Sequence, residues 1–338
     1  MKGYSIYFET LNLNGAVVII IMDVKDIIKL KFDTDFFDEE VRCDYRITSE
    51  TKKIWAVELD LLNELIRVCN KYDIKMCLSC GALLGAVRHG GMIPWDDDID
   101  VSLNRTEYAK LCKVAQTEFK NPYFFQTYES DPQYLFGYAR LRNSLTTGYI
   151  VGMDNLCYNN GIYIDVFVMD GFIDDVQLLK AQEKKLRNLI RLSDIYKGNF
   201  RTGNVMKRIV KRCLYSVFSP LIRAFYSYDE IVSSYLRCQQ QYNDSTDRVA
   251  IISDKLYGVR KNWCKKEDLE DIIYVPFENL MAPIPSNYHF MLSNAYGNYM
   301  DYPPIEKRGV WHKGIIEFDP ETPYIEYLKK ARRKWKVC

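Results

Sequence analysis

The stretch that decides the fold of this chain runs from Cys80 to Leu103 and reads CGALLGAVRHGGMIPWDDDIDVSL. It joins a glycine-rich turn to the basic pair Arg88 and His89 and then to an acidic run. The acidic residues are Asp96, Asp97, Asp98 and Asp100. Turns that expose backbone N–H groups bind phosphate, and clustered carboxylates bind divalent cations. This composition therefore indicates a site where a metal ion is held against a phosphate.

The acidic run has the alternation of a β-strand. If residues 97–103 are extended, Asp98 and Asp100 point to one face, and the apolar residues that alternate with them point to a buried face. Like charges on one face repel each other unless a cation lies between them. Hard oxygen ligands favour Mg²⁺ or Mn²⁺ over Zn²⁺. We therefore predict that Asp98 and Asp100 bind Mg²⁺ or Mn²⁺, that Asp96 is a further metal residue, and that Asp97 points to the opposite face.

The segment before the acidic run reads as strand, turn and helix. Residues 74–78 suit a short strand, and a short helix begins at the glycine turn and covers residues 82–87. Gly81 lets backbone N–H groups approach an anion, and the positive end of the helix dipole strengthens such binding. We therefore expect Gly81 and Ala82 to contact a phosphate of the substrate.

From Gly81 to Asp100 the chain resembles the signature of the LicD family, which is grouped with the fukutin-like proteins in the nucleotidyltransferase superfamily. Later segments resemble further motifs of this family in the same order. They are Gly161–Asp170, with the sequence GIYIDVFVMD, then Tyr296–Met300, with the sequence YGNYM before Pro303 and Pro304, and finally His312. The resemblance covers roughly residues 50–315, and the helical stretch from about residue 174 to 245 carries no motif of the family.

The resemblance implies an α+β fold, in which a nucleotidyltransferase-like mixed β-sheet core is flanked by helices and carries a helical insertion. It implies an enzyme, a phosphotransferase similar to LicD-type cholinephosphotransferases, that moves phosphocholine or a similar phospho-alcohol from a CDP-linked donor. The acceptor would be a hydroxyl of a cell-surface glycan of the lipopolysaccharide, teichoic acid or capsule type, free or linked to a lipid. The residues themselves indicate only the metal–phosphate site.

Two other functions stay open. A nucleotidyltransferase that acts on a sugar or a protein would use the same metal site and differ only in which phosphorus atom is attacked. A non-catalytic protein that binds a glycan or a nucleotide would keep the fold. Every acidic position expected for the metal is present, and this favours catalysis over binding alone.

Phosphoryl transfer requires neutralised charge, in-line geometry and an activated acceptor oxygen. Asp98, Asp100 and Asp165 are the expected catalytic carboxylates, and Asp165 is either a third metal ligand or the base that takes the proton of the acceptor. Guanidinium groups match phosphate oxygens, and side chains two residues apart on a strand share a face. The other residues expected to bind substrate are Arg88, His89, Arg140, Arg142, Tyr296 and His312, the last two by resemblance alone. Ion pairs at the surface are the alternative for the two arginines of the strand.

The bulk composition describes a folded protein without a strong charge bias. The 338 residues are 48% apolar and 27% charged, and the formal net charge is +1. A sizeable core is therefore expected, and no whole-chain attraction to nucleic acid follows. We expect an N-terminal hairpin extension (1–45), a nucleotidyltransferase-like catalytic core (46–172), a basic helical subdomain (173–247) and a C-terminal part that completes the active site (248–338).

Sequence periodicity predicts the elements around the site. A hairpin is expected around Asn14-Gly15, where it would cover a sheet edge or mediate self-association. The expected helices cover residues 52–72, 105–119, 174–191 and 205–226. Further strands are expected at residues 123–127, 136–142 and 161–167.

The expected location is cytoplasmic, with peripheral contact at the inner face of the cytoplasmic membrane. Scattered cysteines in apolar contexts predict reduced core thiols, and the apolar residues 16–22 are too few to cross a bilayer. The segment 205–223 places four cations among bulky apolar residues, namely Lys207, Arg208, Lys211 and Arg212. Such a helix can lie on an anionic membrane surface or pack on the catalytic core as a helical subdomain, and both interpretations stay open.

Overall fold

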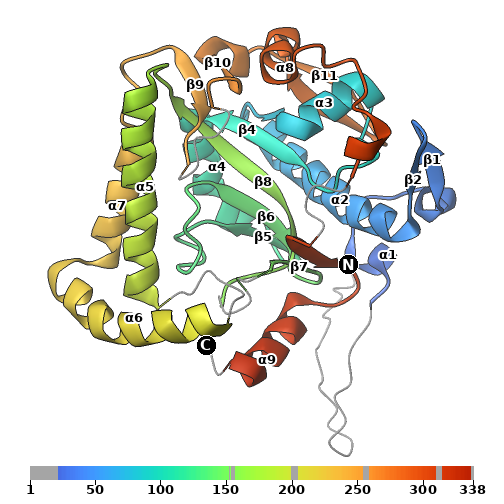
Figure 1. The fold of residues 1–338 in the computed structure, drawn as a ribbon. Coiled ribbons are helices and arrows are strands. Elements are labelled where there is room, and N and C mark those ends of the chain that lie inside the picture. The colour runs from blue at the N-terminus through green and yellow to red at the C-terminus, as the bar shows by residue number, and fades with distance from the viewer. Residues whose placement is uncertain are drawn as a thin grey trace, which may run out of the picture.

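The computed structural model of the chain describes residues 22–151, 153, 157–198, 205–253, 259–309 and 314–335. Its centre is a mixed β-sheet with helices on both sides (Figure 1). This arrangement confirms the α+β class predicted from the sequence. The predicted hairpin around Asn14-Gly15 lies outside the described residues.

The sheet is built around one long strand, β8 (Ile162–Gly171). This strand pairs in parallel with β4 (Asp100–Asn104) and antiparallel with β6 (Ala139–Asn143) and β9 (Arg248–Ile251). The outer strands are β3 (Cys77–Leu78) beside β4, β5 (Tyr123–Gln126) beside β6, and β10 (Trp263–Lys265) beside β9. The parallel register sets Asp100 directly beside Asp165. Strand pairing alone therefore brings two of the predicted catalytic carboxylates together.

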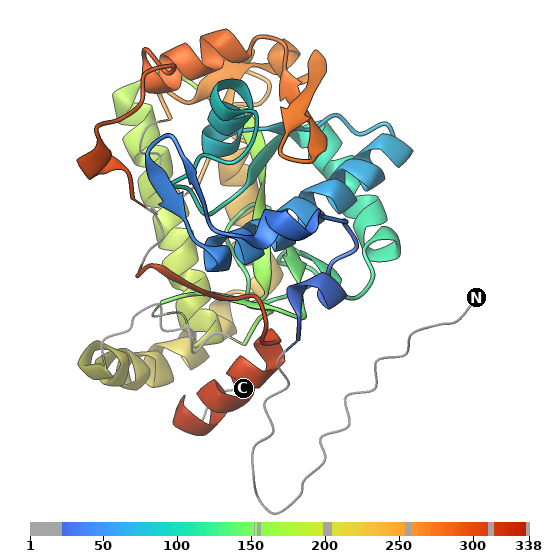
Figure 2. The ribbon, with the colours of Figure 1, turned by 90° about the vertical axis from the view of Figure 1, so that its right-hand side faces the viewer.

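Two layers of helices enclose the sheet. The helix α2 (Ser49–Lys71) covers one face, and α5 (Val176–Lys197) lies on the other side (Figures 1 and 2). The apolar side of α2 is buried in the main hydrophobic cluster, together with the apolar residues of β4 and β8. On the far side, α5 and α7 (Tyr228–Gln239) share a second hydrophobic cluster. Burial of these faces from water is the main force that holds the layers together.

The helix α4 (Arg105–Glu118) begins where the sequence predicts. The side-chain oxygen of Asn104 accepts a hydrogen bond from the backbone N–H of Glu107 over 2.9 Å, as a helix N-cap should. The helix α2 is capped in the same way by Thr48, whose side chain accepts from the backbone N–H of Thr51.

The C-terminal part of the chain returns to the predicted site. The helix α3 (Cys80–His89) is covered by β11 (Ile272–Phe277), which pairs with β12 (Leu280–Pro285), and by α8 (Tyr288–Tyr296) (Figures 1 and 2). The other described elements are α1 (Val24–Ile27), β1 (Glu40–Arg42), β2 (Tyr45–Ile47), β7 (Thr147–Ile150), α6 (Val205–Phe225), β13 (Ile316–Asp319), α9 (Tyr324–Trp335) and the 3-10 turns Thr34–Phe37, Lys266–Leu269 and Ile305–Lys307. The division of the chain into four parts stays a prediction, although β9 and β10 of the expected C-terminal part join the central sheet.

The predicted strand over residues 97–103 is too long at its start. It begins at Asp100. A turn precedes it, in which the N–H of Asp96 donates to the carbonyl of Ile93 over 2.9 Å, and the carbonyl of Ile99 already accepts from the N–H of Asp165 in the neighbouring strand over 3.1 Å.

The prediction of reduced core thiols is wrong at two positions. Cys157 is disulfide-bonded, and Cys213 is exposed on α6. Of the helices in the described part of the chain, none has the length and apolar composition needed to cross a membrane.

Candidate active site

Three aspartates gather in the loop that leads into β4. One carboxylate oxygen from each of Asp96, Asp97 and Asp98 lies within 4.8 Å of the other two. The loop is fixed from below by α2, because the indole N–H of Trp55 donates to the backbone carbonyl of Asp96 over 3.1 Å. Asp97 therefore joins the cluster, and the prediction that it points away from the other aspartates is wrong, because its carboxylate lies with those of Asp96 and Asp98. Three oxygens at this spacing can bind one divalent cation.

Asp100 and Asp165 extend this acidic group onto the sheet. They lie side by side on β4 and β8, as the sequence prediction of a third carboxylate requires. Burial, and then the nearby charges of Asp98 and Asp165, hold the pKa of Asp100 well above its usual range. Asp165 also accepts a hydrogen bond from Nε of Arg140 over 2.6 Å. A cation among these carboxylates would remove their mutual repulsion.

The glycine turn lies against the same loop. A Cβ atom at Gly81 would stand only 2.6 Å from Oδ2 of Asp96, so only glycine lets the start of α3 approach the carboxylate this closely. Ala82 follows in the first turn of α3 and is buried. The backbone N–H groups of this helix start and the acidic loop are thus neighbours, as the sequence predicts.

Arg88 holds the C-terminal segment against α3. Its Nη1 donates to the carbonyls of Tyr299 and Asp301 over 2.9 and 3.1 Å, and its Nε donates to Nε2 of His89 over 2.9 Å. No hydrogen bond joins Nη2 to another residue in the described part of the chain, and Nη2 is the atom we assign to the phosphate contact predicted from the sequence.

His89 is a neutral partner of that arginine. Burial, and then the positive charges of Arg88, Arg42 and Arg308, lower the pKa of His89 to about 4. Its ring stacks on Tyr302, with centroids 5.4 Å apart. The imidazole is therefore uncharged at neutral pH and orients Arg88.

The two arginines of β6 share a face, as predicted, but their surroundings differ. Both guanidinium groups lie over the ring of Tyr163, at 3.7 Å for Arg140 and 4.6 Å for Arg142. Arg140 pairs with Asp165, and its Nη1 is buried with no hydrogen-bond partner among the residues that the structure describes. Arg142 is 1% exposed and donates to the side chain of Gln126 over 2.6 Å and to the carbonyl of Gly161 over 2.5 Å. Arg142 thus links β5, β6 and the residue before β8 through buried hydrogen bonds. Both arginines are buried, so the alternative of surface ion pairs does not apply to them.

A cavity of about 590 Å³ opens above the acidic loop. It is lined by residues of α3, of the loop and of the C-terminal segment, including Gly81, Arg88, Asp96, Asp98, Tyr296 and Asn298. Burial, and then the charges of Cys80 and the aspartates, raise the pKa of the Tyr296 hydroxyl. Tyr296 thus faces the acidic group, whereas His312 lies outside the described residues.

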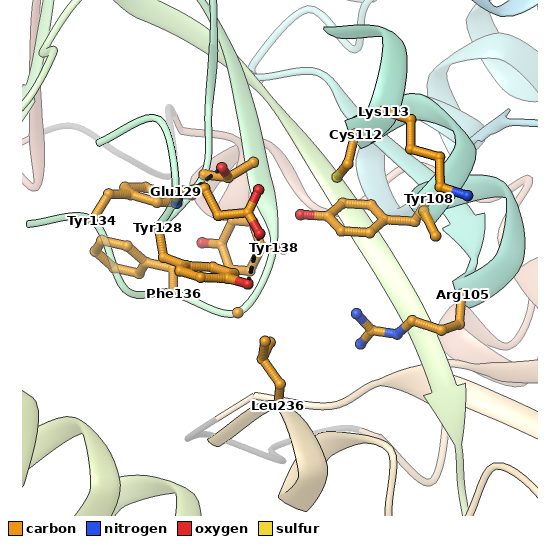
Figure 3. Close-up of a pocket in the computed structure, with 13 residues that line it drawn as sticks. Arg105, Tyr108, Cys112, Lys113, Tyr128, Glu129, Tyr134, Phe136, Tyr138 and Leu236 are labelled. Atoms are coloured by element: carbon orange, nitrogen blue, oxygen red, sulfur yellow. Dashed lines mark hydrogen bonds between the residues drawn. The ribbon is translucent and has the colours of Figure 1, made fainter. Parts of the chain in front are cut away.

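A second cavity, of about 310 Å³, lies between α4, α7 and the segment before β6 (Figure 3). Its walls are mostly aromatic, with Tyr108, Tyr128, Tyr134, Phe136 and Tyr138. Figure 3 shows the hydroxyl of Tyr108 pointing across the cavity toward Glu129. The carboxylate of Glu129 accepts a hydrogen bond from the hydroxyl of Tyr128 over 2.9 Å.

Arg140 connects this second cavity to the acidic group. Besides pairing with Asp165, its guanidinium lies 5.3 to 5.9 Å from the ring centroids of Tyr134, Phe136 and Tyr138. The sequence analysis did not identify these aromatics, although the run Tyr134–Tyr138, YLFGY, is the signal that could have found them.

Comparisons with known proteins agree with this geometry. The model of the family described as "LicD/FKTN/FKRP, nucleotidyltransferase domain" matches residues 73–170. The chain is 28% identical over 261 residues to the lipopolysaccharide cholinephosphotransferase LicD of Haemophilus influenzae, covering 75% of this chain and 92% of that protein. It is also 26% identical over 188 residues to an uncharacterised protein of Rickettsia prowazekii, covering 54% of this chain and 64% of that protein. The matched segment contains the glycine turn, the acidic loop and Asp165, and this part of the chain is therefore similar to the nucleotidyltransferase domain of the LicD family.

Proposed function

We propose that this chain is a metal-dependent phosphotransferase that moves phosphocholine from a CDP-linked donor to a hydroxyl of a lipopolysaccharide glycan. The observation that carries the proposal is the convergence of carboxylates from the loop 96–98, from β4 and from β8 beside the glycine turn. The similarity to a cholinephosphotransferase over 92% of that protein's length supports the transferred group and the acceptor.

The residues present fit a Mg²⁺ or Mn²⁺ ion. Asp96, Asp98 and Asp100 supply oxygen ligands, which these hard cations prefer. When bound, the ion neutralises charge on the diphosphate of the donor. Asp97 is added to this set because its carboxylate lies within the same cluster.

The chain's other residues position the reacting groups. Gly81 at the start of α3 and Arg88 near its end both line the 590 Å³ cavity, where their backbone N–H groups and guanidinium would contact the diphosphate. Asp165 is held by Arg140 beside Asp100. From this place Asp165 either joins the metal ligands or accepts the proton of the attacking hydroxyl.

The aromatic cavity is our candidate for the choline group. A quaternary ammonium is attracted to aromatic ring faces, and the cavity offers five aromatic side chains together with the carboxylate of Glu129. Of the two cations at its edge, Arg105 is paired with the buried Asp170 and Lys113 is exposed. Asp170 is the last residue of the segment 161–170 that resembles the LicD family, and its ion pair with Arg105 gives it a structural role.

We also propose that α6 lies on an anionic membrane surface at the inner face of the cytoplasmic membrane. Large apolar side chains of this helix are exposed, including Met206 at 71%, Val217 at 61% and Phe225 at 79%. This exposure opposes the alternative that the apolar face packs on the catalytic core. Lys207 and Arg212 are exposed on the same helix, and cations beside apolar groups suit acidic lipid headgroups.

Binding of donors tests the proposed function directly. We would measure the unfolding temperature with Mg²⁺ and, in turn, CDP-choline, CDP-ethanolamine, CDP-glycerol, CDP-ribitol and CTP. A ligand at a hundred times its Kd stabilises a protein by about 2.7 kcal/mol, so the rank order of shifts identifies the donor. The proposal predicts the largest shift with CDP-choline, and a larger shift with CTP than with every CDP-linked donor would contradict it.

A further inference from the structure

Glu58 lies on α2 in the layer directly beneath the acidic loop. Its side chain is 0% exposed. One turn earlier on the same helix, Trp55 donates to the backbone carbonyl of Asp96. Residues three apart share a helix face, so the same face of α2 presents both Trp55 and Glu58 to the segment 96–98.

Neither carboxylate oxygen of Glu58 has a hydrogen-bond partner among the described residues. The other acidic groups buried on this helix are all satisfied. Asp60 accepts from the backbone N–H groups of Lys29 and Leu30 over 2.8 and 2.7 Å and from the hydroxyl of Tyr123 over 2.8 Å. Glu64 pairs with Arg67. A buried carboxylate without a partner is strongly unfavourable, so Glu58 requires an explanation that Asp60 and Glu64 do not.

The charges that act on Glu58 are those of the acidic group itself. Apart from burial, which is the main cause, the pKa of Glu58 is raised by Asp98, Asp97, Asp96 and Asp100. Five carboxylates from α2, the loop and β4 thus converge on one region. The partner that could satisfy an oxygen of Glu58 at this place is a cation or a water bound to it.

We propose that Glu58 is a further carboxylate of the metal site, which binds the divalent cation held by Asp96, Asp97, Asp98 and Asp100, either directly or through a coordinated water. Because Glu58 stands on a long, packed helix and the three aspartates on a loop, it would fix the position of the ion relative to the sheet. The inference rests on the metal site of the proposed function but not on the identity of the transferred group.

The variant Glu58→Gln tests this role, because it keeps the shape of the side chain and removes its charge. We would titrate Mn²⁺ into the purified full chain without nucleotide and follow the free ion by electron paramagnetic resonance. Removal of a group that supports a metal site weakens affinity about 10- to 100-fold, and we expect a loss in this range. The unfolding temperature without metal should stay the same or rise, because a buried, unpaired acidic group has been removed. Unchanged Mn²⁺ affinity would overturn the proposal.

Two further variants separate metal binding from folding. Asp60→Asn changes a buried carboxylate on the same helix that does not face the acidic loop, and it should lower the unfolding temperature while the folded protein keeps its Mn²⁺ affinity. Glu58→Asp keeps the charge, and it should bind Mn²⁺ more tightly than Glu58→Gln.

Should Glu58→Gln not fold, equal Mn²⁺ affinity of Glu58→Asp and Glu58→Ala would reject the role. Wild-type protein that binds no Mn²⁺ would refute the proposed metal site as well, whereas equal binding by wild type and Glu58→Gln would refute this inference alone.

Discussion

Asp98 and Asp100 carry the same charge but stand on different supports. Asp98 belongs to the loop held by Trp55, while Asp100 begins β4 and is fixed by its neighbours in the sheet. The register of β4 and β8 sets Asp100 beside Asp165. A cation at the proposed site would thus meet carboxylates held by a helix contact and by the sheet.

Neutral variants of these two residues should separate catalysis from folding. Asp98→Asn and Asp100→Asn should each abolish turnover and weaken Mg²⁺-dependent donor binding. The unfolding temperature should not fall, because removal of one of several like charges relieves repulsion. Steady-state kinetics and calorimetric unfolding check both statements. Asp60→Asn is the control: it weakens hydrogen bonds of a buried carboxylate outside the acidic group, so it should lower stability and keep most of the turnover. Normal activity of both active-site variants would refute the metal assignment.

His89 should make stability sensitive to acid. Its pKa in the folded protein is about 4, against a usual value of 6.5. A folded-state pKa below the unfolded value means that His89 contributes stability above pH 6.5 and that this contribution is lost as the pH falls toward 4. Urea unfolding of wild type and His89→Gln measures the effect. The stability difference between the two proteins should shrink between pH 7 and pH 4.5, and a constant difference would contradict the assignment.

For single residues, the local sequence pattern identified part of the candidate site. The Asp-x-Asp run and Gly81 lie close together in the sequence, and their spacing was enough to predict that they share one site. Asp97 and Arg142 could not be placed in this way, because the side of the loop that Asp97 occupies and the burial of Arg142 depend on tertiary neighbours. Glu58 has the same difficulty, since a Glu in an amphipathic helix usually faces water.

Among the elements, the pair β4 and β8 carries the site most directly. Their parallel register was not part of the sequence prediction, although both strands were. Periodicity identifies a strand and its buried face, but pairing depends on which strands meet after the chain has folded. The helices α2, α4, α5 and α6 were predicted to within a few residues at most ends, because long amphipathic segments give the strongest signal.

The aromatic segment before β6 should bind the choline group and not the nucleotide. Loss of one cation–π contact of about 0.5 to 2 kcal/mol weakens binding by about 2- to 30-fold. We therefore expect Phe136→Leu to raise the Kd of CDP-choline within this range, measured by calorimetry with Mg²⁺. The Kd of CDP serves as the internal control and should not change. An equal loss for both ligands would show that the cavity does not hold the choline group.

The helix α6 should mediate membrane binding. Flotation with vesicles that contain anionic lipid would compare wild type with a protein in which Lys207, Arg208, Lys211 and Arg212 are all changed to Glu. The wild type should float and the variant should remain in solution, because reversed charge repels acidic headgroups. Lys180→Glu with Lys184→Glu, at exposed positions of α5, is the matched control and should float like the wild type. Equal partitioning of all three proteins would rule out a role for α6.

Across the whole molecule, the active site is assembled from distant parts of the chain. The helix α2 supports the acidic loop, α3 supplies the glycine turn, and the segment 296–303 closes the cavity near the aspartates. Arg88 ties this last segment to α3 through two backbone carbonyls. A single sequence indicates such contacts between distant segments only through resemblance to a family, because no local pattern shows which segments meet in the fold.

The reaction itself is the most direct test of the central claim. Purified protein would be incubated with Mg²⁺, CDP-choline and lipopolysaccharide that lacks phosphocholine, with Asp98→Asn as the inactive reference, and products would be followed by mass spectrometry. Phosphocholine transfer predicts equal amounts of CMP and of phosphocholine-modified glycan, both absent from the Asp98→Asn reaction. A parallel reaction would contain CTP in place of CDP-choline. Pyrophosphate release and a nucleotide attached to the acceptor in that reaction, with no modified glycan from CDP-choline, would contradict the claim.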